Sequence, residues 1–125
     1  MKARELRIGN LVNYHTAEGD ILVARIDWQD LKWISKDEKG FNIAHSAIPL
    51  TEEWLLKFGF EEYEFEDEIF GYVLNDFGYV NEFQFMIRIF IDFEGILIQK
   101  PIKFVNQLQN LYFALTGEEL TIKTE

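Results

Sequence analysis

The sequence has no cysteine, only two prolines and two histidines among 125 residues, and no long apolar run. Without cysteine it forms no disulfide, no thiol nucleophile and no thiolate metal site. Its longest apolar segment, residues 85–93, is interrupted by Arg88 and Asp92 and is far shorter than the roughly 20 residues of a membrane span. Charges at Lys2 and Arg4 leave no apolar stretch for a signal peptide. We therefore expect a cytoplasmic protein without membrane contact.

Basic residues are also scarce, and the scarcity is uneven. The chain has 12 Lys and Arg against 22 Asp and Glu, a net charge of -10. Residues 1–50 contain seven basic and seven acidic residues, whereas residues 51–125 contain five and fifteen. Phosphate contacts need a basic face, so we do not expect the second part to bind nucleic acid, whereas the charge of the first part excludes it less strongly. The asymmetry predicts two units, 1–50 and 51–125, which could also pack as one compact domain.

The first unit has the pattern of a small all-β unit. Short strand-like segments, separated by a loop around Gly19 and a turn at 36–40, occupy residues 6–14, 21–27, 31–35 and 41–48. Four or five short strands in about 50 residues are typical of an SH3-like barrel. Trp28, between two of these strands, would then lie at the barrel mouth.

A short helix is expected at 52–58. Thr51 is a favourable N-cap residue, and Leu50 and Leu55 have the spacing of a hydrophobic staple. Gly59 supplies the residue after the helix that can adopt a left-handed conformation.

The remaining residues predict an antiparallel sheet covered by a C-terminal helix. The expected strands are 62–66, 69–74, a long strand at 79–92, and 96–99. The apolar strand segment 83–91 should be central or covered, because such a strand would aggregate at an exposed edge. Apolar residues at helical spacing from Ile102 to Leu115 predict a helix with Pro101 in its first turn and Gly117 at its end. The predicted fold class is therefore α+β.

Two groups of residues are candidates for an interaction surface. Tyr14, Trp28 and Trp33 could form an aromatic platform on the barrel, although core packing also explains most aromatic residues. The polar side of the C-terminal helix is neutral rather than charged, with the candidate contact residues Asn106, Gln107 and Asn110.

Glu62, Glu64 and Glu66 alternate along one predicted strand and form a candidate acidic face. Alternate strand residues lie about 6.7 Å apart, a spacing at which carboxylates could imitate successive phosphates. A cation site is a second alternative, since Ca²⁺ and Mg²⁺ prefer carboxylate oxygens. A solubilising face that protects a sheet edge is the third.

An enzymatic role has no positive support in the sequence. His15 and His45 are the only imidazoles, no third ligand is spaced for zinc, and the nucleophile-elbow and phosphate-loop motifs are absent. No catalytic residue, metal or cofactor is predicted. A deep pocket joining His45 to carboxylates would favour an enzyme again.

Three blocks of the sequence resemble a family of small uncharacterised proteins of Bacteroides-group gut bacteria, their prophages and related mobile elements. The blocks are MKARELRIGNLVNY, IPLTEEWLLKFGF and KFVNQLQNLYFALTGEEL, and they span both ends and the middle of the chain. The family often has a His before the QLQN segment, where this sequence has Asn106, so no metal or acid-base role is carried over to that position. The resemblance implies a phage or mobile-element setting and no mechanism.

These observations lead to two hypotheses of function. The first is a non-enzymatic interaction module, an accessory protein of a phage or mobile element that binds an unknown protein partner, with a homo-oligomer as an open alternative. The second is an acidic inhibitor or nucleic-acid mimic that occupies the basic cleft of a host protein.

Overall fold

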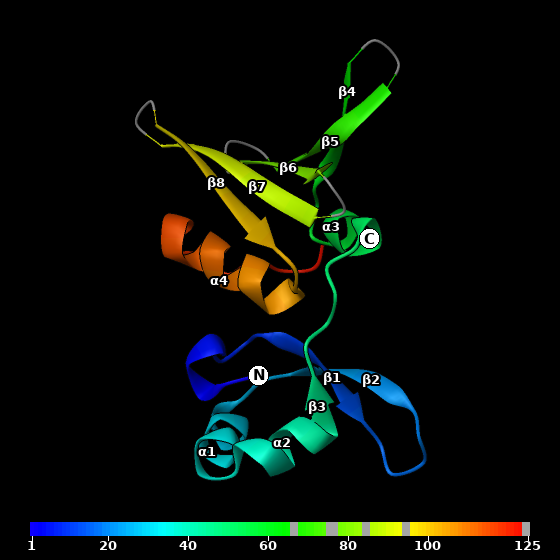
Figure 1. Ribbon diagram of the computed structural model, residues 1–125, viewed down its shortest axis with the longest axis vertical. Coiled ribbons are helices and arrows are strands. Elements are labelled where there is room, and N and C mark those ends of the chain that lie inside the picture. The colour runs from blue at the N-terminus through cyan, green and yellow to red at the C-terminus, as the bar shows by residue number, and fades with distance from the viewer. Residues whose placement is uncertain (66–67, 75–77, 84–85, 94–95, 124–125) are drawn as a thin grey trace. The chain divides into compact units, whose positions relative to one another are not determined.

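A computed structural model of the chain describes residues 1–65, 68–74, 78–83, 86–93 and 96–123. It is a mixed helix and sheet structure, as the α+β prediction requires (Figure 1). The chain divides into two compact units. Unit 1 comprises residues 1–49 and 104–111, and unit 2 comprises residues 50–103 and 112–125. The return of residues 104–111 to unit 1 was not expected from the sequence.

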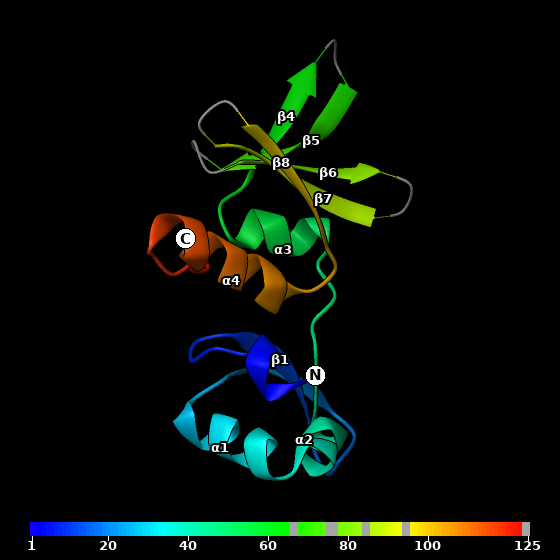
Figure 2. The same cartoon turned by 60° about the vertical axis from the view of Figure 1, so that its left-hand side comes forward.

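Unit 1 is built on a three-stranded antiparallel sheet of order β2-β1-β3. Its strands are β1 (Leu11–His15), β2 (Ile21–Arg25) and the short β3 (His45–Ser46), preceded by the 3-10 turn η1 (Ala3–Glu5). Two consecutive helices, α1 (Trp28–Lys36) and α2 (Glu38–Ala44), lie on one side of this sheet (Figures 1 and 2).

The SH3-like barrel is wrong for unit 1, because the strands expected at 31–35 and 41–48 are mostly helical. Local capping explains the difference. The Asp27 carboxylate accepts a hydrogen bond from Asp30 N at 2.9 Å, and Asp30 accepts one from Asp27 N at 3.0 Å. The Asp37 carboxylate accepts from Gly40 N at 3.0 Å and so begins α2. These caps satisfy donors that a helix start leaves unpaired, and they outweigh alternations that span only five and eight residues.

The core of unit 1 is a cluster of buried aliphatic side chains and one phenylalanine: Leu6, Val12, Ile26, Ile34 and Phe41. Phe41 is completely buried, and its ring stacks on the His45 ring with centroids 4.0 Å apart. Trp33 meets both rings edge-on at 5.4 Å. The residues expected on strands therefore form the helical part of the core instead.

Unit 2 contains a five-stranded antiparallel sheet with the strands in chain order. The strands are β4 (Glu61–Phe65), β5 (Glu68–Leu74), β6 (Gly78–Phe83), β7 (Met86–Phe93) and β8 (Ile96–Ile102). The single long strand expected at 79–92 is wrong, because β6 and β7 are separate strands that pair with each other. The central position expected for the apolar segment is confirmed, since β7 pairs with both β6 and β8. The sequence also predicts a hairpin loop at 75–78, of which residues 75–77 lie outside the described residues.

The short helix of unit 2 is confirmed as α3 (Glu52–Lys57). The Thr51 hydroxyl accepts a hydrogen bond from Trp54 N at 3.4 Å, as an N-cap does. Gly59 has a positive φ of 95°, and Phe60 N donates to Leu55 O at 3.0 Å. Sequence signals that act within one turn were sufficient here.

The C-terminal helix, α4 (Val105–Thr116), begins later than expected. Pro101 belongs to β8, an edge strand, where a residue without an N–H is tolerated. Gln107 Oε1 accepts a hydrogen bond from Phe104 N at 3.1 Å and helps to cap the helix. Residues 105–111 of α4 belong to unit 1 and residues 112–116 to unit 2, so the covering of the sheet by this helix stays a prediction. Gly117, with φ of 76°, follows the end of the helix as predicted.

Candidate functional site

The three candidate aromatic residues are all solvent-accessible, but they do not form one platform. Trp28 is 62% exposed at the first position of α1, and Trp33 lies five residues further along the same helix. Five residues turn a helix by about 500°, so the two indoles face different sides. Tyr14 and Trp33 instead meet around His45, with ring centroids 5.3 and 5.4 Å from the imidazole. The structure thus brings together Tyr14 and Trp33 and leaves Trp28 apart.

The neutral residues of α4 are largely internal rather than presented to a partner. Asn106 is only 3% exposed, and its Nδ2 donates to Glu5 O at 3.3 Å. Asn110 Nδ2 donates to the same oxygen at 3.0 Å. Of the three predicted contact residues on this helix, only Gln107 is exposed. The predicted surface on this helix is therefore mainly a connection within unit 1.

Two further amides complete this connection: Asn10, which the sequence did not point to, and Gln109, which lies on the predicted neutral side of the helix but was not among the expected contact residues. Asn10 is 1% exposed and its Nδ2 donates to Asn110 Oδ1 at 2.8 Å. Gln109 Oε1 accepts from Leu11 N at 2.9 Å, and its Nε2 donates to Gly9 O at 3.3 Å. We call Asn10, Asn106, Gln109 and Asn110 the amide cluster. An uncharged run of amides on a helix was the available signal, because buried polar groups need partners that charged side chains rarely supply.

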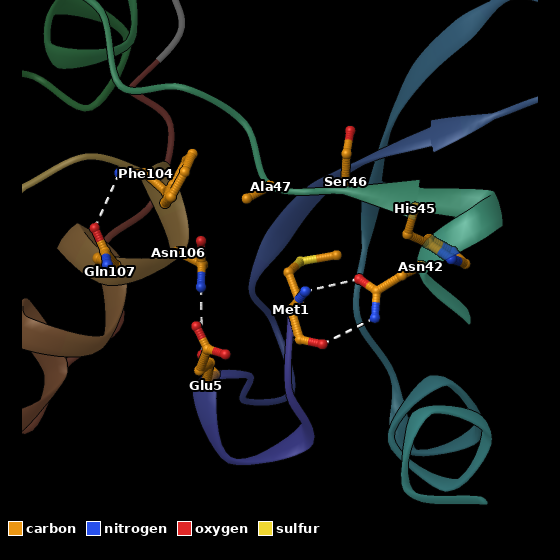
Figure 3. A pocket seen from close by; sticks show the side chains of 9 residues that line it. All are labelled: Met1, Glu5, Asn42, His45, Ser46, Ala47, Phe104, Asn106 and Gln107. Carbon is orange, nitrogen blue, oxygen red and sulfur yellow. Dashed lines mark hydrogen bonds between the residues drawn. The ribbon is translucent and has the colours of Figure 1, made fainter. Parts of the chain in front are cut away.

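A pocket of about 430 Å³ lies beside the amide cluster in unit 1 (Figure 3). Its lining comes from the N-terminal segment, α2, β3 and the start of α4: Met1, Glu5, Asn42, His45, Ser46, Ala47, Phe104, Asn106 and Gln107. Asn42 is fully engaged with Met1, accepting from Met1 N and donating to Met1 O, both at 2.8 Å. The pocket is within the size range of small-molecule sites.

Asn106 gives this pocket its distinctive chemistry. Glu5 O can only accept, so the Asn106 atom that faces it is Nδ2. The other amide atom, Oδ1, is buried and has no hydrogen-bond partner among the described residues. A buried carbonyl oxygen without a donor costs roughly 1–3 kcal/mol, so this atom calls for a further partner.

The pocket places His45 and the carboxylate-bearing Glu5 in one lining, and among the described residues the two side chains have different hydrogen-bond partners. His45 Nδ1 is 3.0 Å from Phe41 O, and its ring is held in the aromatic stack. Ser46 Oγ contacts His15 Nε2 at 2.9 Å, and its side chain points away from Met1 and Asn106 (Figure 3). In residues 1–49 no carboxylate contacts the other nitrogen of His15, so the orienting group of a nucleophile-base pair is missing from that segment.

The exposed edge of β2 is a second feature, and the sequence pattern of residues 21–25 does not predict it. Ile21, Leu22 and Val23 are 60%, 55% and 54% exposed, although they follow one another in a strand. Consecutive strand residues point to opposite faces, so both faces of this strand are apolar and open. β2 is also at the edge of its sheet.

The acidic face is only partly described. Glu62 is exposed at the start of β4 next to the exposed Glu61. The side chain of Glu64, and Glu66 altogether, lie outside the described residues. Within the described part of the chain, no group of three or more His, Cys, Asp or Glu is placed to hold a metal ion. In the same residues no helix combines the length and apolar character needed to cross a membrane.

Comparisons with known proteins add no relative. A scan against protein-family models, a search of curated proteins and a search of solved structures each found no match to this chain. The family resemblance of the three sequence blocks, and the setting it implies, therefore remain predictions.

Proposed function

We propose that the protein is a non-enzymatic interaction module that assembles through the free edge of β2, and that the strand added there is β2 of a second copy. The observation that carries the proposal is the run of three exposed apolar residues, Ile21 to Val23, on an edge strand. Strand addition uses main-chain hydrogen bonds for affinity and side chains on both faces for specificity. The accessory role in a phage or mobile element, implied by the sequence resemblance, is part of the same proposal.

The hydrogen-bond pattern between β1 and β2 indicates which main-chain groups of β2 could bond to an added strand. Ile26 N donates to Asn10 O at 2.8 Å, and Thr16 N donates to Asp20 O at 2.9 Å, which brackets the β1-β2 ladder. Bonded and non-bonded pairs alternate in an antiparallel ladder, so the even-numbered residues of β2 bond to β1. The main-chain groups of Ile21, Val23 and Arg25 consequently face away from β1.

Charge favours a second copy of the same strand as the occupant. Asp20 precedes β2 and Arg25 ends it, and both residues are exposed. In an antiparallel pair centred on Val23, Asp20 of each chain lies at the same end as Arg25 of the other chain. Opposite charges at both ends determine the direction and register in which the two β2 strands pair, and they contribute less to the affinity of the dimer. Residues 1–49 and 104–111 carry seven basic and seven acidic residues, so no net charge of unit 1 opposes the approach.

The test measures the mass of the full chain in solution by analytical ultracentrifugation over a range of concentrations. We expect a concentration-dependent dimer, and the variant Val23→Lys should weaken it by at least about tenfold, the equivalent of about 1.4 kcal/mol. Ile43→Lys is the matched control, because Ile43 is 74% exposed on α2 and is not part of the edge. A wild-type chain that stays monomeric at every soluble concentration, or equal effects of the two lysine variants, would refute the proposal.

Charge swapping tests the register independently. The single variants Asp20→Arg and Arg25→Asp should each weaken self-association, because each places like charges at both ends of the pair. A mixture of these two variants should recover the dimer as a heterodimer with opposite charges at both ends. Charge reversal of Glu62, Glu64 and Glu66 should leave assembly unchanged, whereas loss of assembly in that variant would favour the acidic-face hypothesis.

A further inference from the structure

We infer that the pocket beside the amide cluster is a binding site for a small uncharged ligand that presents an N–H donor, such as a planar primary amide, and that Asn106 Oδ1 is the acceptor. The pocket and the edge of β2 are different parts of unit 1, so ligand binding in the pocket does not depend on the proposed assembly.

The pocket is lined by a residue with an unsatisfied hydrogen-bond acceptor. Asn106 is 3% exposed and lines the pocket, and its Oδ1 has no partner among the described residues. Its orientation is fixed, because Nδ2 is used by Glu5 O. The remaining members of the amide cluster have their side-chain oxygens occupied: Asn10 Oδ1 accepts from Arg7 N at 2.6 Å, and Gln109 Oε1 accepts from Leu11 N. Within the cluster, only Asn106 retains an unused acceptor.

The chemistry of the surrounding lining favours an uncharged ligand. Ala47 and Phe104 supply apolar surface, and Phe104 offers a ring on which a planar ligand could pack (Figure 3). The one carboxylate of the lining belongs to Glu5, which is exposed and accepts from Lys2 N at 2.8 Å. A carboxylate open to water selects a cationic ligand only weakly. A neutral donor that reaches Asn106 Oδ1 therefore fits better than a cation.

Hydrogen bonds hold the part of α4 that forms the pocket wall in place. Asn106 lies in the first turn of α4, and Val105 N next to it donates to Ile48 O at 2.9 Å. Asn110, one turn further along, shares the Glu5 O acceptor. The pocket wall is thus held by hydrogen bonds between segments about 100 residues apart in sequence. A preformed wall loses little conformational freedom when a ligand binds.

The experiment compares two probes of nearly the same shape, benzamide and methyl benzoate, by ¹H–¹⁵N NMR titration of the full-length protein. Benzamide donates N–H groups and methyl benzoate does not. We expect benzamide to bind roughly tenfold more tightly, the effect of one hydrogen bond worth about 1.4 kcal/mol, and to shift the Asn106 side-chain signals. Equal binding of both probes, or no binding of benzamide, would overturn the inference and leave a bound water as the partner of Asn106 Oδ1. Benzylamine distinguishes a cation site, and its binding more tightly than benzamide would also overturn it.

Two variants test the site from different sides. Asn106→Leu removes the acceptor and should abolish the preference for benzamide. Because it also removes the bond to Glu5 O and could disturb folding, Ala47→Leu is the second variant, which narrows the pocket while keeping Asn106. Ala17→Leu, the same change at an exposed position between β1 and β2, is the matched control and should bind benzamide as the wild type does. Unchanged binding in Ala47→Leu would place the probe elsewhere. Val23→Lys should still bind benzamide, which separates this inference from the proposed assembly.

Discussion

Unit 1 and unit 2 differ in how their charge is balanced. Unit 1 has seven basic and seven acidic residues, net zero, whereas unit 2 has five and fifteen, net -10. The net charge of the whole chain is therefore a property of unit 2 alone. Unit 1 is held together by a buried apolar cluster and by the amide cluster. A neutral surface with an open apolar edge can associate with another copy, while the acidic surface of unit 2 disfavours close approach.

The largest expected effect is on unfolding free energy, and it tests whether the cores of the two units unfold independently. Phe41 in unit 1 and Phe58 in unit 2 are both completely buried. Each Phe→Ala variant should lose about 3–5 kcal/mol of unfolding free energy, through lost burial and the cavity that remains. Hydrogen exchange measured by NMR should increase mainly in the unit that carries the substitution. An equal increase in both units would show that they unfold as one and would remove the distinction between them.

The next effect concerns the amide cluster. Gln109→Leu keeps the volume of the side chain but leaves Leu11 N and Gly9 O without the partners they have in the native chain. We expect a loss of about 1–3 kcal/mol in urea unfolding, since buried unpaired groups keep their full desolvation cost. Gln29→Leu, on the exposed side of α1, is the matched control and should change stability by less than about 0.5 kcal/mol. Similar losses in the two variants would mean that the cluster does not hold unit 1 together.

The smallest effect is a pH dependence at the start of α1. The hydrogen bond from Asp30 N holds the pKa of Asp27 below its ordinary value of 3.8, against a smaller opposing effect of desolvation. The charged carboxylate is thus favoured in the folded state. Its contribution to stability should be present above pH 3.8 and should be lost as the pH falls through the lowered pKa. An NMR titration of the Asp27 carboxyl group checks this, and a pKa at or above 3.8 would contradict it. Asp27→Asn, which keeps an N-cap without a charge, should remove this pH dependence.

The parts of the fold that were predicted correctly are those specified within one or two turns of chain. The α3 helix was recognisable because Thr51 and Gly59 mark its two ends. The central position of β7 followed from its apolar sequence. The helices α1 and α2 were missed because residues 31–35 and 41–48 alternate over a length too short to distinguish a strand from a helix, while the decisive signal lay in Asp27 and Asp37. Those two caps were present in the sequence but were interpreted as loop and turn residues.

The candidate site was less predictable than the fold. Trp28 and Gln107 are exposed, but Asn106 was assigned to a surface and is buried. The reason is long-range: its partner, Glu5 O, is 101 residues away in the chain. The open edge of β2 was equally hidden, because an apolar strand has the same sequence pattern whether its neighbours cover it or not.

By itself, the sequence determined the α+β class, the absence of cysteine chemistry, the confinement of the net charge to one part of the chain, and the elements with strong local caps. These follow from composition and from interactions between residues close in sequence. Tertiary structure alone decided that residues 104–111 join unit 1, that Asn106 lines a pocket with an unused acceptor, and that β2 stays at an edge. Each of these depends on contacts between distant segments, whose formation depends on the packing of the whole unit and leaves no periodic signal in the sequence.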